Sequence, residues 1–261
     1  SDCYHDQILY HDNLTDPLTS WNILTDDVHY AHTIAGDGET ILIDDTENNR
    51  LLSFHKRGEE YIQGTTFENI GMKPHYVQYD ADRQQFLAWS SITGEMFYLR
   101  KDEQSQELYI EKTLQIPELY GVYVRSFTIM GDEIWFVSGH NDQQIITADI
   151  DTLTVHEKFS VPAQLAGMVQ LIRIQDYYYI TVSTDNTENQ DYATIIRTAS
   201  PEALSRGEYE DVYAEFGLSQ GTPYYITCID SRYYMTHHRT SQNIIAFDVI
   251  DNVISNVQVI Y

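Results

Sequence analysis

The chain has few basic side chains. Lys and Arg number 15 against 40 Asp and Glu over 261 residues, which gives a formal charge of −25. A field of this sign repels phosphate backbones and anionic lipid surfaces, so we expect no nucleic-acid partner and no docking on a membrane. No apolar run approaches the ~20 residues that a membrane-spanning helix requires, so we expect no membrane insertion either. The protein is expected to be a monomer.

Cysteine and local catalytic motifs are also scarce. Cys3 lies near the N-terminus, and Cys228 lies in the apolar run YYITCI, where we expect an ordinary buried thiol. A disulfide between the two is the alternative. The chain contains no G-x-S-x-G elbow, no G-x-x-x-x-G-K-[ST] phosphate loop, no C-x-x-C pair and no H-E-x-x-H metal motif. No short motif therefore identifies an enzyme class.

The N-terminus and the composition bear on where the protein works. The chain starts at Ser1 without a signal-like segment, which is typical of a processed product or of a chain whose leader has been cut away. Its 21 Tyr and scarce Lys predict a secreted or surface-attached bacterial protein.

A hairpin pattern recurs along the sequence. The segment 41–54, ILIDDTENNRLLSF, has two apolar strands joined by a polar turn, which indicates a β-hairpin. An apolar pair in its second strand returns at steps of 45, 49, 50 and 49 residues along the chain. The pairs are Leu51-Leu52, Met96-Phe97, Ile145-Ile146, Ile195-Ile196 and Ile244-Ile245.

Each repeat holds about four short strands, and this pattern predicts an all-β fold, a single β-propeller with five four-stranded blades. A single sheet cannot bury both faces, so the units must pack face to face around an axis. The expected blades cover about 27–72, 73–120, 121–166, 167–220 and 221–261. Residues 1–26 lack the repeat and are expected to add strands that close or cover the ring, with six blades as the alternative. Ser200 and Pro201 predict one helical turn in the fourth unit.

A propeller would gather polar and aromatic side chains on one face. The loop that enters each innermost strand and the loop between the second and third strands emerge together around the central channel. The residues predicted to form a site there are His32, Asp44, Asp45, His75, Trp89, Tyr123, Arg125, His140, His237 and His238. Imidazole, guanidinium and ring groups on one rim fit a small molecule, a carbohydrate or a protein partner.

One turn of the sequence resembles a known repeat family. The stretch IDDTENNRLLSF is similar to the NHL repeat, on the strength of Asp44, Asn48, Asn49, Arg50, Leu51 and Phe54. The other four units keep the strand pattern and lose the Asn-Arg element. The resemblance implies a propeller, and this family includes binding platforms as well as metal-dependent enzymes.

The same resemblance implies a metal alternative. The peptidyl-hydroxyglycine amidating lyases are NHL-like propellers that hold zinc through histidines from separate blades. On that analogy His32, His75 and His237 would be the ligands of a divalent metal, with Arg125 polarising the substrate. Loop histidines that bond to backbone or water are the simpler interpretation. An acidic rim also suits calcium, and a glycosidase carboxylate pair drawn from Asp27, Asp45, Asp80 and Asp185 is a further alternative.

The leading functional hypothesis from sequence is a non-catalytic propeller that binds a ligand or protein on the channel face. The runner-up is a metal-dependent lyase or hydrolase with a histidine-lined central site. A purely structural interaction platform that uses Trp89 and Tyr123 is the third.

Overall fold

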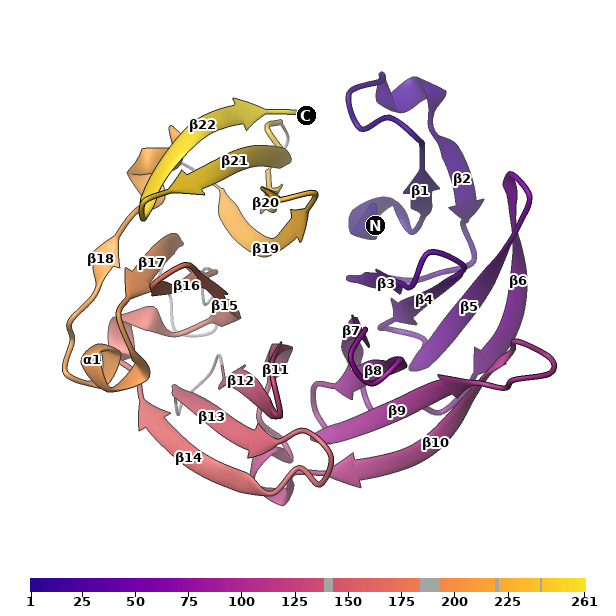
Figure 1. Cartoon of the computed structure of the whole chain (residues 1–261), viewed down its shortest axis with the longest axis horizontal. Coiled ribbons are helices and arrows are strands. Elements are labelled where there is room, and N and C mark those ends of the chain that lie inside the picture. Colours follow the sequence, from indigo (N-terminus) through magenta and orange to yellow (C-terminus); the bar gives the residue numbers. More distant parts are fainter. Residues whose placement is uncertain (139–142, 184–192, 219–220, 240) are drawn as a thin grey trace. The chain divides into compact units, whose positions relative to one another are not determined.

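Short segments rich in apolar residues form β-strands along the described part of the chain (Figure 1). The structure is a computed structural model, and it describes residues 1–138, 143–183, 193–218, 221–239 and 241–261. Five four-stranded sheets follow one another along the sequence, and in each sheet the strands are hydrogen-bonded in chain order. The fold is therefore the predicted β-propeller with five four-stranded blades.

The chain divides into two compact units, Ser1–Val122 and Tyr123–Tyr261, which we call unit 1 and unit 2. Unit 1 contains a two-stranded N-terminal sheet and the first two blades, and its elements are η1 (Cys3–His5), β1 (Ile8–Tyr10), η2 (Leu18–Ser20), β2 (Asn22–Thr25), β3 (Ile34–Gly36), β4 (Thr40–Asp45), β5 (Arg50–Arg57), β6 (Glu60–Phe67), β7 (Pro74–Asp80), β8 (Gln85–Ser90), β9 (Glu95–Lys101), β10 (Leu108–Gln115) and η3 (Pro117–Leu119).

Unit 2 contains the third, fourth and fifth blades. Its elements are β11 (Val124–Met130), β12 (Glu133–Ser138), β13 (Gln144–Asp149), β14 (Val155–Ser160), η4 (Ala163–Leu165), β15 (Met168–Ile174), β16 (Tyr177–Val182), β17 (Thr194–Thr198), α1 (Pro201–Ser205), β18 (Glu210–Asp211), η5 (Tyr213–Phe216), β19 (Thr222–Ile229), β20 (Arg232–His238), β21 (Ile244–Ile250) and β22 (Val253–Val259). No helix in the described part of the chain has the length and apolar character needed to cross a membrane.

The recurring apolar pair explains why the blades pack on both faces. Neighbouring residues of a strand point to opposite faces of the sheet. Leu51 of β5 packs in a cluster with Phe86 of the second blade, whereas Leu52 packs on the other face with Ile8 of the N-terminal sheet. In the fourth blade the pair Ile195–Ile196 likewise divides between two separate clusters. Both faces of these third strands are therefore buried.

The N-terminal segment forms a sheet of its own, in which β1 pairs with β2. Its Ile8 is buried and packs in one cluster with Ile43 and Leu52 of the first blade. The segment is thus attached to the first blade by apolar contact. Its expected role in closing or covering a ring stays a prediction.

The helical turn expected after Ser200 is present as α1. The Ser200 Oγ accepts a hydrogen bond from the Ala203 backbone amide at 3.2 Å, and Pro201 is the first helical residue. A serine cap followed by proline is a favourable start for a helix because proline has no amide hydrogen to leave unbonded.

The cysteines differ from expectation. Cys228 is exposed rather than buried, because the last three residues of β19 face outward, and both cysteines are free thiols. Burial raises the pKa of the half-buried Cys3 thiol to about 12, with the Asp44 and Asp6 carboxylates adding to the effect. Cys3 therefore stays protonated at neutral pH.

The turn that resembles the NHL repeat is held together by one buried carboxylate. Asp45 is completely buried and accepts hydrogen bonds from Arg50 Nε at 2.6 Å, from Asn48 Nδ2 at 2.9 Å and from the His29 amide at 2.7 Å. Arg50 also pairs with the exposed Asp27 at 3.1 Å. The Asn and Arg of the motif therefore neutralise and satisfy a buried charge in the hairpin.

Replacement of Asp45 by Ala should lower the free energy of unfolding by about 3 kcal/mol, because it leaves Arg50 without its buried partner. The matched control is Asp27→Ala, which removes the exposed partner of the same Arg50 and should cost no more than about 1 kcal/mol. Urea denaturation of both variants measures the difference. Equal losses in the two variants would contradict the structural role assigned to Asp45.

Candidate functional site

The first two blades bring three of the predicted polar residues to one end of unit 1. His32 lies in the loop that enters β3, Asp44 lies near the end of β4, and His75 lies at the start of β7. Successive antiparallel strands run in opposite directions, so the start of a first strand and the end of a second strand lie at the same end of a blade. We call this end of the two blades the upper face of unit 1.

Asp44 is the buried acid of the upper face. Its carboxylate accepts hydrogen bonds from the His32 amide at 2.6 Å, from the Thr33 amide at 3.0 Å and from the Thr33 hydroxyl. Burial raises the pKa of Asp44 from 3.8 to about 7, although these hydrogen bonds oppose the change. The group is therefore poised to gain or lose a proton near neutral pH.

His32 is linked to this carboxyl group through its amide and through Thr46. Its Nδ1 is 2.8 Å from the Thr46 hydroxyl, which in turn lies 3.5 Å from Asp44 Oδ1. A hydroxyl has one proton, so if Thr46 donates to Asp44 then His32 Nδ1 carries a proton and donates to Thr46. Nε2 is then the basic nitrogen of the ring.

His75 fixes the plane of the His32 ring. The two rings stack with their centroids 3.9 Å apart and an angle of 29° between their planes. His75 is completely buried, whereas His32 is only partly buried. The stacked pair thus combines a buried ring from the second blade with a more accessible ring from the first.

One threonine couples the acid to the second blade. The Thr33 hydroxyl donates to Asp44 and accepts a hydrogen bond from the Val77 amide of β7 at 2.9 Å. The same hydroxyl therefore joins the two blades and orients the acid. Sequence reasoning missed both Thr33 and Thr46, since a single hydroxyl in an apolar strand has no local motif.

Trp89 and Asp45, two further residues predicted for the rim, also lie in the interior. Trp89 is completely buried on β8, and Asp45 is completely buried in the hairpin turn described above. A buried indole does not present its face to a ligand, so Trp89 supports packing in this structure. His140 lies outside the described residues.

Unit 2 contains its own polar group around Arg125. Arg125 Nη1 donates to the Gly167 carbonyl at 3.0 Å and to Ser183 Oγ at 2.5 Å, and its guanidinium lies 5.3 Å from the centre of the Tyr123 ring. Sequence reasoning named Arg125 and Tyr123 and missed Ser183. These contacts join the third and fourth blades through a charged side chain.

His237 is also part of unit 2, where it is buried. Its Nε2 lies 2.9 Å from the Tyr213 hydroxyl, which donates to the Gly221 carbonyl at 2.9 Å. Burial lowers the pKa of His237 to about 4, so the ring is neutral at pH 7. His238, the next residue, is exposed.

The positions of the histidines bear on the metal alternative. In the described ranges no group of three or more His, Cys, Asp or Glu side chains is arranged to hold a metal ion. His32 and His75 belong to unit 1 and His237 to unit 2, so the three-histidine set stays a prediction. Elemental analysis of the purified protein and of its His75→Ala and His237→Ala variants would test it.

Comparison with solved structures shows that other proteins share this fold. The chain superimposes with a TM-score of 0.65 and 11% identity on a proposed 6-phosphogluconolactonase from Bacteroides uniformis, over 97% of this chain and 78% of that one. It matches the periplasmic gluconolactonase PpgL of Pseudomonas aeruginosa with a TM-score of 0.61 and 11% identity, over 97% and 78% of the two chains. Hydrazine synthase of Kuenenia stuttgartiensis matches with a TM-score of 0.64 and 13% identity, over 95% and 72%.

These likenesses show the fold and correct the leading hypothesis from sequence. No family model matches the chain, and no curated protein matches it in sequence. A non-catalytic binding propeller was the leading interpretation, but the propellers that this chain resembles include proteins named as lactonases. The comparison therefore favours the enzymatic alternative over the non-catalytic one.

The raised pKa of Asp44 predicts how the stability of the protein changes with pH. Between about pH 4 and pH 7 the folded protein retains the Asp44 proton that the unfolded chain has lost, so stability from this group falls as pH rises. The free energy of unfolding of the wild type, relative to Asp44→Asn, should fall by up to about 4 kcal/mol across this window. Urea denaturation of both proteins at several pH values measures it. A difference that is constant with pH would show that Asp44 ionises at its ordinary pKa.

Proposed function

We propose that this protein is a hydrolase of the β-propeller class that opens a cyclic ester, a lactone. The observation that carries the proposal is the buried Asp44 carboxyl bonded to the His32 amide, with the His32 ring stacked on His75, on the upper face of unit 1. A buried acid that orients an accessible imidazole is a common arrangement for activating water. The fold shared with gluconolactonase-type propellers supports the choice of ester.

His32 is assigned the role of general base. Its Nε2 takes a proton from a water molecule as the water oxygen forms a bond to the lactone carbonyl carbon. The bond between that carbon and the ring oxygen then breaks, and His32 returns the proton to the ring oxygen, which leaves as a hydroxyl group. The product is an open hydroxy acid, and no other reactant is consumed.

Asp44 and His75 act through His32. The ionised Asp44 lies next to the ring through Thr46 and through the His32 amide, so it stabilises the imidazolium that forms in the transition state. His75 restricts the rotation of the ring by stacking on it. Both are positioning residues, because the assigned contact with substrate is made by His32.

The charge of the chain favours an unphosphorylated substrate. With 40 acidic and 15 basic residues the protein repels a phosphate ester, whereas a neutral sugar lactone meets no such barrier. The substrate class proposed is therefore a neutral aldonolactone. The NHL-like turn fits a propeller of this class, and we assign it no role in binding or hydrolysing the lactone.

The proposal predicts that the wild type hydrolyses D-glucono-δ-lactone faster than the spontaneous reaction, and faster than it hydrolyses 6-phosphogluconolactone. The His32→Gln variant should lose about 100-fold or more in kcat, since general-base catalysis contributes on that scale. A pH-stat measures acid release, with the spontaneous rate subtracted.

The matched control is His156→Gln, which changes an exposed histidine of β14 in unit 2 and should retain full activity. Thermal unfolding of each variant verifies that it is folded. No hydrolysis of either lactone above the spontaneous rate, or unchanged kcat in folded His32→Gln protein, would overturn the proposal.

A further inference from the structure

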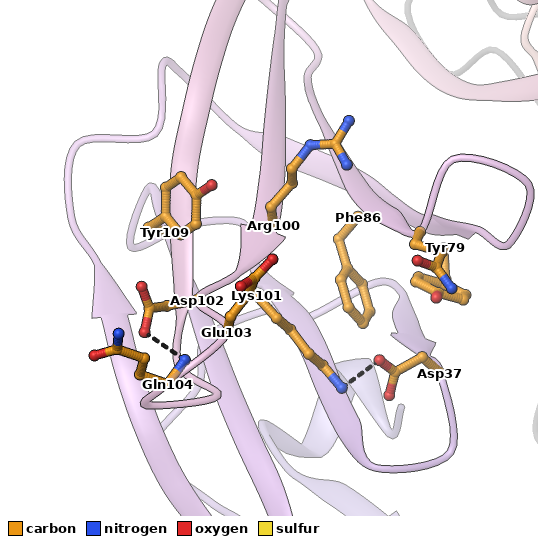
Figure 2. Close-up of a pocket in the computed structure, with 10 residues that line it drawn as sticks. Asp37, Tyr79, Phe86, Arg100, Lys101, Asp102, Glu103, Gln104 and Tyr109 are labelled. Carbon is orange, nitrogen blue, oxygen red and sulfur yellow. Dashed lines mark hydrogen bonds and ion pairs between the residues drawn. The ribbon is translucent and has the colours of Figure 1, made fainter.

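A second hollow lies at the opposite end of the first two blades. It is a cavity of about 710 Å³ in unit 1, which we call the lower pocket (Figure 2). Asp37 follows the end of β3, Tyr79 is near the end of β7, and Lys101 is the last residue of β9. His32 and His75 lie at the starts of the same first strands, so the lower pocket is separate from the upper face.

All four strands of the second blade contribute to its wall. Tyr79, Phe86, Lys101 and Tyr109 come from β7, β8, β9 and β10 in turn, and Asp37 comes from the first blade. Figure 2 shows Lys101 reaching across to Asp37, and the two form an ion pair at 2.5 Å. The pocket therefore lies at the junction between the two blades of unit 1.

The ion pair between Asp37 and Lys101 at this junction keeps its charges across the neutral pH range. Burial alone would raise the pKa of Asp37, but the hydrogen bond from Lys101 and those from the Thr40 and Glu39 amides lower it. Asp37 is therefore ionised across the neutral range, and Lys101 remains paired to it.

The loop that borders the pocket is held at both ends. Asp102 Oδ1 accepts hydrogen bonds from the Gln104 amide at 3.1 Å and from the Ser105 amide at 2.8 Å. At the far end Glu107 reaches the first blade, where it accepts from the Thr65 amide at 3.1 Å and from the Thr65 hydroxyl at 3.0 Å. A wall tied in this way is formed before a ligand arrives, which lowers the entropy lost on binding.

The charge balance of the pocket argues against an anionic ligand. Lys101 is paired with Asp37, and Arg100 is paired with Glu111 at 2.8 Å. Glu103 adds a further negative charge to the lining. A phosphate or carboxylate would have to compete with these carboxylates inside a strongly acidic protein.

Aromatic faces and paired charges together suit a sugar. Tyr109 of β10 is 44% exposed and is the open aromatic ring of the lining. Phe86 is only 1% exposed and packs with its ring centre 4.8 Å from that of Tyr79, so these two rings support the wall. A saccharide has C–H faces that stack on aromatic rings, and vicinal hydroxyls that hydrogen-bond at once to carboxylate and guanidinium groups. We propose that the lower pocket binds a neutral saccharide, with Tyr109 as the stacking surface and Arg100 as a hydroxyl ligand.

This inference is independent of the proposed hydrolase activity. The lower pocket shares no residue with the upper face, so a saccharide would be held there rather than hydrolysed. The role that fits is attachment to glycan, or retention of a sugar-containing substrate close to the molecule.

The test uses saturation-transfer-difference NMR on the intact protein with maltose, cellobiose and lactose as probes. At least one of them should give signals, and Tyr109→Ala and Arg100→Gln should each weaken its binding about 10-fold, which corresponds to the loss of about 1.4 kcal/mol that one stacking or charged hydrogen-bond contact contributes.

Two control variants make the result specific. Tyr120→Ala removes a tyrosine of unit 1 that is 68% exposed and does not line the pocket, and it should leave binding unchanged. His32→Gln should also leave it unchanged, because His32 lies on the upper face.

Three results would overturn the inference. They are the absence of signal from every saccharide with folded protein, unchanged binding in both pocket variants, and loss of binding in His32→Gln, which would place the sugar on the upper face. Failure of lactone hydrolysis alone would leave the inference standing.

Discussion

The packing of the blades depends on burying both faces of the third strand, as the first and fourth blades show. An adjacent apolar pair such as Leu51 and Leu52 sends one side chain to each face, and the two enter different clusters. A lone four-stranded sheet would leave these faces in water. Face-to-face packing of successive sheets follows from this constraint, and the polar loops at the strand ends are positioned by it.

Much of the fold follows from the sequence for the same reason. The apolar pair recurs at nearly constant steps, and the buried strands of the structure coincide with it, as Ile195 and Ile196 in β17 illustrate. The helical turn after Ser200 was predicted from its cap. The exposure of single residues could not be predicted in the same way. Cys228 lies in an apolar run, which predicts burial, but the last three residues of β19 are exposed.

The candidate site was predictable in part. Position in a propeller blade was enough to place His32 and His75 at one end of unit 1, because loop order fixes which strand ends coincide. It could not show that their rings stack or that Trp89 is buried, because those details depend on side-chain packing between distant segments. Thr33 escaped notice because its hydroxyl acts through a contact 44 positions away, at the Val77 amide.

Two different chemistries occupy opposite ends of the same pair of blades. The upper face has a protonatable acid and imidazole rings, while the lower pocket has fixed ion pairs and aromatic surfaces. The activity assigned to the upper face rests on the coupling of Asp44 to His32. The pH dependence of kcat/KM for glucono-δ-lactone, compared in the wild type and Asp44→Asn, tests this coupling most directly. The account predicts a wild-type rate that rises through about pH 7 and a variant that is slower and whose profile is displaced from that of the wild type, because only the imidazole of His32 still titrates there. Superimposable profiles would contradict it.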